Sequence, residues 1–210
     1  MKLNPETLRL YAVTDRAWLH GRTLESQVEQ AILGGATIVQ LREKALTGEA
    51  LLTEAKSLCA LCRRYGVPFL VNDDVELALA VGADGVHVGQ EDMAAEQARA
   101  LLGPDKLIGV SAHNVAQAVA AQRAGADYLG CGAAFVTGTK TDAKPIPRET
   151  LQAVTAAVNI PVVAIGGITR GNLPRLRGCG LAGAAVVSAL FAQEDVQEAA
   201  RELFRLAGQL

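Results

Sequence analysis

The sequence predicts a single (β/α)8 barrel domain that spans residues 1–210. Eight short apolar segments alternate with eight stretches of helical periodicity, without a linker or a break in composition. Half of the residues are hydrophobic but only 4% are aromatic, as expected for parallel strands buried on both faces. Connections closed by Gly35, Gly82 and Gly125 recur before the even-numbered strands. This faint repeat indicates successive strand–helix units.

The elements are placed by periodicity and by the residues at their ends. Thr23 is a favourable N-cap for the first helix, which Gly34 ends, and Gly66 ends the second helix. The expected strands are residues 9–15, 36–43, 67–71, 85–88, 107–110, 128–130, 161–165 and 184–187. The expected helices are residues 23–33, 47–65, 75–81, 94–102, 114–124, 148–158, 172–177 and 195–206. An open doubly wound sheet is the alternative fold, but no Gly-x-Gly-x-x-Gly follows the first strand.

Charge and hydropathy exclude several classes of function. The net charge of −2 offers no basis for non-specific binding of nucleic acid or of a membrane surface. The chain starts without an apolar signal core, and no apolar run approaches the length of a membrane span. We therefore expect a cytoplasmic protein that acts on small molecules, and homo-oligomerisation is left open.

The four cysteines are interpreted as structural thiols. Cys59 and Cys62 form a Cys-x-x-Cys pair, but both fall on the apolar face of the expected helix 47–65. Buried cysteine behaves as a small hydrophobic residue. Because no second such pair and no nearby pair of histidines exists, a zinc or redox site is disfavoured. The remaining two, Cys131 and Cys179, stand alone.

In a barrel of this type, active sites form where the strands end. Gln40, Arg42 and Lys44 alternate with Leu41 and Glu43 at the end of the second strand. Alternation puts the three polar side chains on one face, and a polar face is acceptable only if it points into the mouth of the barrel. The alternative is that Arg42 and Glu43 belong to a cluster of ion pairs at the rim.

Acidic residues follow the next two strands. Asp73 and Asp74 end the third strand, while Glu91 and Asp92 follow the fourth. Carboxylates near the expected cations suit a divalent ion that bridges carboxylate and phosphate oxygens. Asp73 and Asp92 are the better candidates, because Asp74 is well placed as a helix N-cap and Glu91 stays ambiguous.

The three histidines carry weaker signals. His87 lies within an apolar strand and is interpreted as a core residue. His113 follows Ser111 at the end of the fifth strand, where contact with a ligand stays open. His20 is assigned no role.

The loop after the sixth strand is rich in hydroxyl groups and cations. Thr137, Thr139 and Lys140 offer hydroxyl donors, backbone N–H groups and an ammonium group that suit a phosphate or pyrophosphate. The alternative is an ordinary solvated loop. Gly167 and Ser188 follow the seventh and eighth strands, in the part of the barrel that commonly grips phosphate. The mouth is therefore expected to hold two anionic groups.

Taken together, these motifs resemble the thiamine phosphate synthase family. The resemblance runs in order across nearly the whole chain and is carried by the segments at 10–15, 40–44, 71–74, 85–92, 109–111, 137–140 and 165–168. It implies a (β/α)8 barrel that joins hydroxymethylpyrimidine diphosphate to a thiazole phosphate, or to its carboxylated form, in a Mg²⁺-dependent reaction. The products would be thiamine phosphate and pyrophosphate, formed by dissociative loss of pyrophosphate.

The resemblance also implies roles for individual residues. Asp73 and Asp92 would hold Mg²⁺, and Arg42, Lys44, Ser111 and Lys140 would act in catalysis. The residues implied for the pyrimidine diphosphate are Gln40, Leu41, Arg42, Glu43, Lys44, Asn72, Ser111 and Lys140. The residues implied for the thiazole phosphate are Thr137, Gly138, Thr139, Gly167, Val187 and Ser188.

One departure and two alternatives accompany the resemblance. Ala133 and Val136 stand where the family usually has prolines, so we expect the loop to be less rigid. The alternatives are a related thiazole tautomerase and a non-catalytic phosphate-binding regulatory barrel. The tautomerase has no need of a diphosphate site, so it is disfavoured by the presence of Arg42, Asp73, Asp92 and Lys140.

Overall fold

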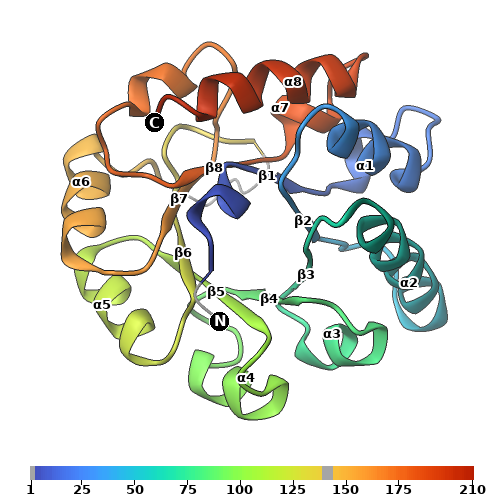
Figure 1. Cartoon of the computed structure of the whole chain (residues 1–210), viewed down its shortest axis with the longest axis horizontal. Coiled ribbons are helices and arrows are strands. Elements are labelled where there is room, and N and C mark those ends of the chain that lie inside the picture. The colour runs from blue at the N-terminus through green and yellow to red at the C-terminus, as the bar shows by residue number, and fades with distance from the viewer. Residues whose placement is uncertain (1–2, 139–143) are drawn as a thin grey trace.

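The computed structural model describes residues 3–138 and 144–210 and contains a closed barrel of eight parallel strands, arranged in sequence order. Each strand pairs with the next, and β8 closes on β1, where Tyr11 lies opposite Ala185. Figure 1 shows the strands around the centre and the helices outside them. The strands are β1 (Leu10–Val13), β2 (Ile38–Leu41), β3 (Phe69–Asn72), β4 (Gly85–Val88), β5 (Leu107–Ala112), β6 (Tyr128–Gly132), β7 (Val162–Ile165) and β8 (Gly183–Val186). The predicted fold is confirmed.

Helices cover the outside of the barrel. The α-helices are α1 (Leu24–Leu33), α2 (Gly48–Tyr65), α3 (Val75–Val81), α4 (Ala95–Leu102), α5 (Val115–Arg123), α6 (Arg148–Ala157), α7 (Ser188–Phe191) and α8 (Val196–Ala207). The 3₁₀ helices are η1 (Pro5–Leu8), η2 (Arg16–Trp18) and η3 (Leu173–Leu176). Thr23 caps α1 by accepting a hydrogen bond from the N–H of Ser26, as its sequence position predicted. Within the described residues, no helix combines the length and apolar character needed to cross a membrane.

Two details of the helices differ from the expectation. The segment expected as helix 172–177 is the shorter 3₁₀ helix η3, which has Pro174 in its first turn. Gly178, with φ +74°, follows it and turns the chain away. The short helix α7, between β8 and α8, was not predicted from the sequence.

Apolar side chains form two separate cores. The larger lies between the strands and the outer helices and includes all four cysteines, which are buried and free. The smaller fills the inside of the barrel with side chains such as Tyr11, Ile38, Leu70, Tyr128 and Val163. Alternate residues of a strand thus serve opposite cores. The assignment of the cysteines to the apolar packing is confirmed.

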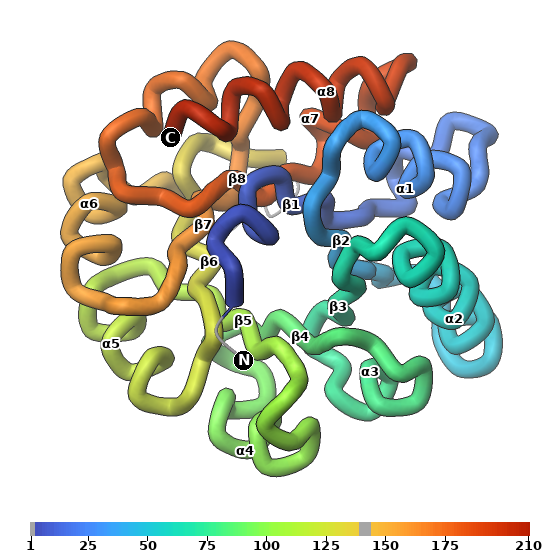
Figure 2. Tube along the Cα trace, in the orientation of Figure 1, coloured from blue at the N-terminus to red at the C-terminus, as the bar shows by residue number. Residues whose placement is uncertain are grey.

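The amino-terminal segment closes one end of the barrel. Figures 1 and 2 show η1 lying across the centre of the ring of strands. Leu8 of η1 is fully buried and belongs to the inner core. Among the described residues, η1 thus covers the amino-terminal end of the barrel, opposite the carboxyl ends of the strands.

Candidate active site

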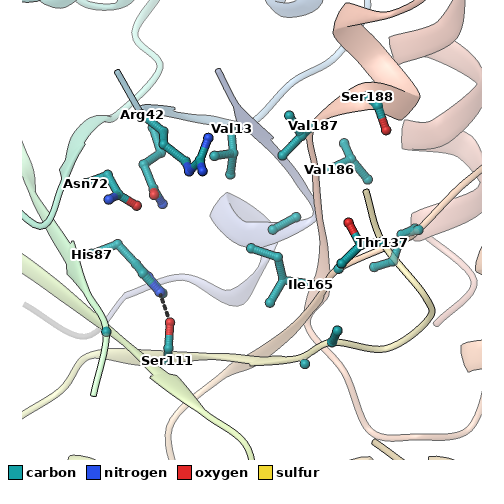
Figure 3. Close-up of a pocket in the computed structure, with 18 of the residues that line it drawn as sticks. Val13, Arg42, Asn72, His87, Ser111, Thr137, Ile165, Val186, Val187 and Ser188 are labelled. Atoms are coloured by element: carbon teal, nitrogen blue, oxygen red, sulfur yellow. Dashed lines mark hydrogen bonds between the residues drawn. The ribbon is translucent and has the colours of Figure 1, made fainter. Parts of the chain in front are cut away.

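A single pocket at the carboxyl ends of the strands brings together most of the predicted site residues. Figure 3 shows side chains from opposite sides of the barrel pointing into it. The predicted residues that line it are Gln40, Arg42, Lys44, Asn72, Asp73, Asp92, Ser111, Thr137, Gly167, Val187 and Ser188. Leu41, Glu43 and Gly138 do not line it, and Thr139 and Lys140 lie outside the described residues.

The alternation predicted for the end of β2 places its polar side chains in the pocket. Gln40, Arg42 and Lys44 line the pocket, whereas Leu41 is buried in the outer core. Arg42 and Lys44 lie just beyond the last strand residue, and the alternation continues past it. The predicted orientation of Gln40, Arg42 and Lys44 toward the mouth of the barrel is confirmed. The side chain of Leu41 packs in the outer core.

The ion pairs considered as an alternative also exist. Arg42 Nη1 donates to Oδ2 of Asp15 at 3.2 Å, so the guanidinium is both paired and exposed to the pocket. Glu43 turns the other way and accepts from Arg16 Nε at 2.7 Å. Its Oε1 also accepts the N–H of Ala45 at 2.6 Å. Glu43 therefore holds the turn after β2 in place, and only its backbone remains near the site.

Asp73 and Asp92 form an acidic pair on the rim. Asp92 accepts the N–H of Gly89 at 2.7 Å, and Asp73 accepts from the side-chain amide of Asn72. Desolvation of the carboxyl and the neighbouring Asp92 raise the pKa of Asp73 to about 6. Asp74 instead caps α3 by accepting the N–H of Leu77 at 2.8 Å, as predicted. Glu91 does not line the pocket.

Below the rim, a chain of hydrogen bonds crosses the barrel interior from β2 to β5. Gln40 Nε2 donates to the hydroxyl of Tyr11 at 2.6 Å, and that oxygen lies 2.7 Å from the hydroxyl of Tyr128. His87 Nδ1 lies 3.0 Å from Tyr128 Oη, and His87 Nε2 lies 3.0 Å from Ser111 Oγ. Figure 3 marks the contact between His87 and Ser111. Gln40, His87 and Ser111 line the pocket, so both ends of the chain reach it.

Two histidines contribute to the pocket. His87 is 6% exposed, and burial lowers its pKa to about 4, so the ring is neutral at physiological pH. The prediction of a core histidine is confirmed, although the ring also forms part of the pocket floor. His113 lines the pocket too, with its Nδ1 2.5 Å from the carbonyl oxygen of Gly132.

The opposite side of the pocket carries hydroxyl groups and closely approaching backbone. In Figure 3, Thr137, Val187 and Ser188 face Arg42 and Asn72 across Ile165. These three residues and Gly167 contribute to the lining.

Gly167 adopts a left-handed conformation with φ +64°. A Cβ atom there would lie 2.2 Å from the carbonyl oxygen of Val136. Only glycine fits because the loop after β6 packs against it.

Sequence reasoning missed the two buried tyrosines, Tyr11 and Tyr128. Their hydroxyl groups form the middle of the chain of hydrogen bonds although the residues are 117 positions apart. The available signal was the placement of tyrosine within apolar strands of a chain that is 4% aromatic. A buried phenol needs a hydrogen-bond partner, which predicts a polar network without identifying its members.

Comparisons with known proteins agree on one family. The family model described as "Thiamine monophosphate synthase" matches residues 10–190. The chain is 53% identical over 196 residues to a thiamine-phosphate synthase of Chloroflexus aurantiacus, covering 93% of this chain and 90% of the relative. It is 48% identical over 197 residues to that of Ruminiclostridium cellulolyticum, covering 94% of each. A solved thiamine phosphate pyrophosphorylase from Pyrococcus furiosus is 40% identical, covers 97% of each chain and superposes with a TM-score of 0.89.

Proposed function

Because the chain belongs to the thiamine monophosphate synthase family, we propose that its pocket joins 4-amino-2-methyl-5-hydroxymethylpyrimidine diphosphate to 4-methyl-5-(2-phosphoethyl)thiazole. The products are thiamine phosphate and pyrophosphate, and the carboxylated thiazole is an alternative substrate. The observation that carries the proposal is the two-sided pocket. In Figure 3, Arg42 and Asn72 lie on one side, and Thr137 and Ser188 lie on the other. Lys44 and the acidic pair follow β2, β3 and β4, whereas Gly167 follows β7. Two anionic substrates can thus be bound facing one another.

The side formed by β2 to β5 suits the pyrimidine diphosphate. Arg42 and Lys44 supply positive charge for the diphosphate, with Lys140 assigned the same role from the sequence alone. Gln40, Asn72 and Ser111 supply hydrogen bonds. The side formed by the loop after β6 and the ends of β7 and β8 suits the thiazole phosphate. The residues assigned to it there are Thr137, Gly167, Val187 and Ser188, and Gly138 and Thr139 are assigned to the same phosphate from the sequence alone.

The acidic pair fits Mg²⁺. Among the described residues, no group of three or more His, Cys, Asp and Glu side chains could hold a metal ion. Mg²⁺ is commonly held by one or two carboxylates, with substrate phosphate and water completing its octahedron. Two carboxylates in hydrogen-bonding contact, one with its pKa raised, are a donor set that a divalent cation stabilises. Asp73 and Asp92 are accordingly assigned to Mg²⁺, which when bound neutralises charge on the diphosphate.

The chemistry begins with cleavage of the bond between the pyrimidine methylene carbon and the diphosphate oxygen. The bonding electrons leave with pyrophosphate, and Arg42, Lys44 and Lys140 stabilise the charge that accumulates there. The resulting pyrimidine cation is captured by the thiazole nitrogen, which forms the new C–N bond. The apolar side chains of Val13 and Ile165, which line the same pocket, limit access of competing water. The protein thus acts by orienting and neutralising its substrates.

We also propose which partners the enzyme has and where in the cell it acts. Its partners are small molecules, its location is the cytoplasm, and the charge of −2 gives no reason to expect nucleic acid or membrane binding.

A pyrophosphate-release assay tests the function. We expect release with both substrates and Mg²⁺, with thiamine phosphate formed in equal amount. Omitting the thiazole phosphate, or adding a chelator, should stop formation of thiamine phosphate. Absence of thiamine phosphate from a folded protein supplied with both substrates and Mg²⁺ would overturn the proposal.

A further inference from the structure

The chain of hydrogen bonds inside the barrel links Gln40 on β2 with Ser111 on β5, at two places in the pocket lining, through side chains that are themselves almost inaccessible. Tyr128 is 0% exposed, Tyr11 1% and Gln40 3%. The connections run from Gln40 on β2 to Tyr11 on β1, Tyr128 on β6, His87 on β4 and Ser111 on β5. Only the two ends, at Gln40 and Ser111, and the edge of His87 meet the pocket.

Glycines make the space for this chain. Gly109 lies between His87 and Tyr128 in the register of the strands. A Cβ atom at Gly109 would lie 2.1 Å from the Tyr128 ring and 2.5 Å from His87 Nδ1. A Cβ atom at Gly130 would lie 2.9 Å from His87 Cε1. The two rings therefore occupy volume that side chains of β5 and β6 would otherwise fill, and their contact is specified by the packing.

The direction of donation along the chain follows from its first member. The Gln40 amide nitrogen can only donate, so Tyr11 accepts from it. The proton of Tyr11 then needs an acceptor, and the Tyr128 oxygen at 2.7 Å can serve as one. Tyr128 in turn gives its proton to His87 Nδ1. Burial raises the pKa of both phenols, so each keeps the proton it donates. A doubly protonated ring at His87 would leave the Tyr128 proton without an acceptor.

The remaining ring proton is then on Nε2 of His87, which donates to Ser111 Oγ. Ser111 receives one hydrogen bond from below and keeps its own proton for a partner in the pocket. At the other end, Gln40 commits one of its two N–H donors to Tyr11, which fixes the orientation of the amide and leaves its carbonyl oxygen and its second N–H for other partners. If the Gln40 side-chain amide were rotated so that its carbonyl oxygen faced Tyr11, each hydrogen bond of the chain would run in the opposite direction. Ser111 would then donate its proton to His87.

We propose that His87 and Tyr128 are positioning residues for the reaction proposed above: they fix Ser111 as a hydrogen-bond donor toward the pyrimidine diphosphate. This rests on the proposed function for the identity of the ligand. The polarity of the chain rests on donation by the Gln40 amide nitrogen to Tyr11. The ligand must therefore present an acceptor atom to Ser111.

The first test needs no substrate. The full chain labelled with ¹⁵N histidine is studied by long-range ¹H–¹⁵N NMR at pH 7, and His87→Gln identifies the signals of that ring among the three histidines. We expect a neutral His87 with its proton on Nε2. In Tyr128→Phe, which removes the donor to Nδ1, we expect a mixture of tautomers. A proton on Nδ1 in the wild type, or an unchanged tautomer in Tyr128→Phe, would overturn the proposal.

The second test uses a double-mutant cycle with Ser111. Tyr128→Phe should lower kcat/KM roughly tenfold, the usual effect of misdirecting one hydrogen bond. In a Ser111→Ala background, the same change should lower kcat/KM by less than about twofold, because the donor that Tyr128 positions is already absent. The changes in melting temperature caused by Tyr128→Phe and Ser111→Ala should add in the double variant. If Tyr128 were only structural, the losses in kcat/KM would add in the same way.

The matched control is Tyr65→Phe. Tyr65 donates to Glu29 on the outer surface at 2.6 Å, and its replacement should leave both kcat/KM and the His87 tautomer unchanged. Equal losses from Tyr128→Phe in both backgrounds would sink the positioning role. If the wild type forms no thiamine phosphate, the proposed function fails, and the NMR result still decides the polarity of the chain.

Discussion

Asp73 and Asp92 lie in hydrogen-bonding contact, although they follow different strands of the barrel. Asp73 has φ +63°, a left-handed conformation that aspartate tolerates better than most residues. Its N–H donates to the carbonyl oxygen of His87 at 2.8 Å, which ties the end of β3 to β4. The backbone thus holds two like charges close together at the mouth of the pocket, and this closeness has consequences for stability and for activity.

The first prediction concerns stability and pH. The pKa of Asp73 is raised to about 6 in the folded state, so the folded protein binds this proton more tightly than the unfolded chain. Its contribution to stability is complete below about pH 4 and is lost as the pH rises through about 6. Without metal, the free energy of unfolding should therefore decline across this window. We expect a decline of less than about 1 kcal/mol, because Asp73, although its carboxyl is partly desolvated, still contacts solvent that screens its charge.

Urea unfolding at several pH values measures this effect. Asp73→Asn should remove the decline, whereas Asp105→Asn, in the exposed loop before β5, should keep it. Added Mg²⁺ should stabilise the wild type more at pH 8 than at pH 5, because the metal needs ionised carboxylates. Equal stabilisation by Mg²⁺ at both values would contradict the assignment of the metal.

The second prediction separates two neighbouring aspartates by activity. Asp92→Ala should lower turnover by a factor of about 100 or more, because it removes one of two proposed Mg²⁺ ligands. Asp74→Ala should keep turnover within about threefold and lower stability by about 1 kcal/mol, because Asp74 caps α3. Steady-state assays across a range of Mg²⁺ concentrations check both. Equal losses of turnover in the two variants would remove Asp92 from the metal site.

Much of the molecule was predictable because its information is local. Each strand–helix unit carries its own apolar periodicity and its own end signals, such as Thr23 at the start of α1. The residues at strand ends were also predictable. Alternation along β2 decides which side chains face the mouth, and the fold decides that the strand ends meet there.

The interior contacts were not predictable in the same way. Whether Tyr11 meets Tyr128 depends on the stagger of strands around the barrel and on the room that Gly109 leaves. The partner of Arg42 was also hidden, since Asp15 lies on the preceding unit and its distance depends on the turn after β1. Such pairings depend on how the strands are aligned with one another in the folded barrel. They cannot be predicted from the pattern of residues within each strand.

The third prediction concerns the thiazole phosphate. Ser188 lies across the pocket from Arg42 and Asn72. Ser188→Ala should raise KM for the thiazole phosphate about tenfold through loss of one hydrogen bond to an anion, and KM for the pyrimidine diphosphate by less than about twofold. Ser57→Ala, at a serine that donates to Glu25 on the outer helices, is the control. A parallel rise in both KM values would show that Ser188 does not select the thiazole phosphate.

The fourth prediction compares two arginines near the turn after β2: Arg42, which precedes this turn, and Arg16, which pairs with Glu43 in it. Arg42 is paired with Asp15 while its guanidinium also lines the pocket. The planar guanidinium can donate to both a carboxylate and a phosphate, but a lysine ammonium offers no such fork. Arg42→Lys should therefore raise KM for the pyrimidine diphosphate about tenfold while the net charge is preserved.

Arg16→Lys provides the matched control for that change. Arg16 makes two ion pairs, with Glu43 at 2.7 Å and Glu54 at 2.5 Å, but it does not line the pocket. Its replacement should lower the melting temperature by a few degrees, because the two partly buried carboxylates lose the guanidinium that pairs with both of them. KM should stay within about twofold of the wild-type value. Suppose that Arg16→Lys raised KM as much as Arg42→Lys. The effect of Arg42→Lys would then come from a change in the turn after β2. Direct contact between the Arg42 guanidinium and the diphosphate would be refuted.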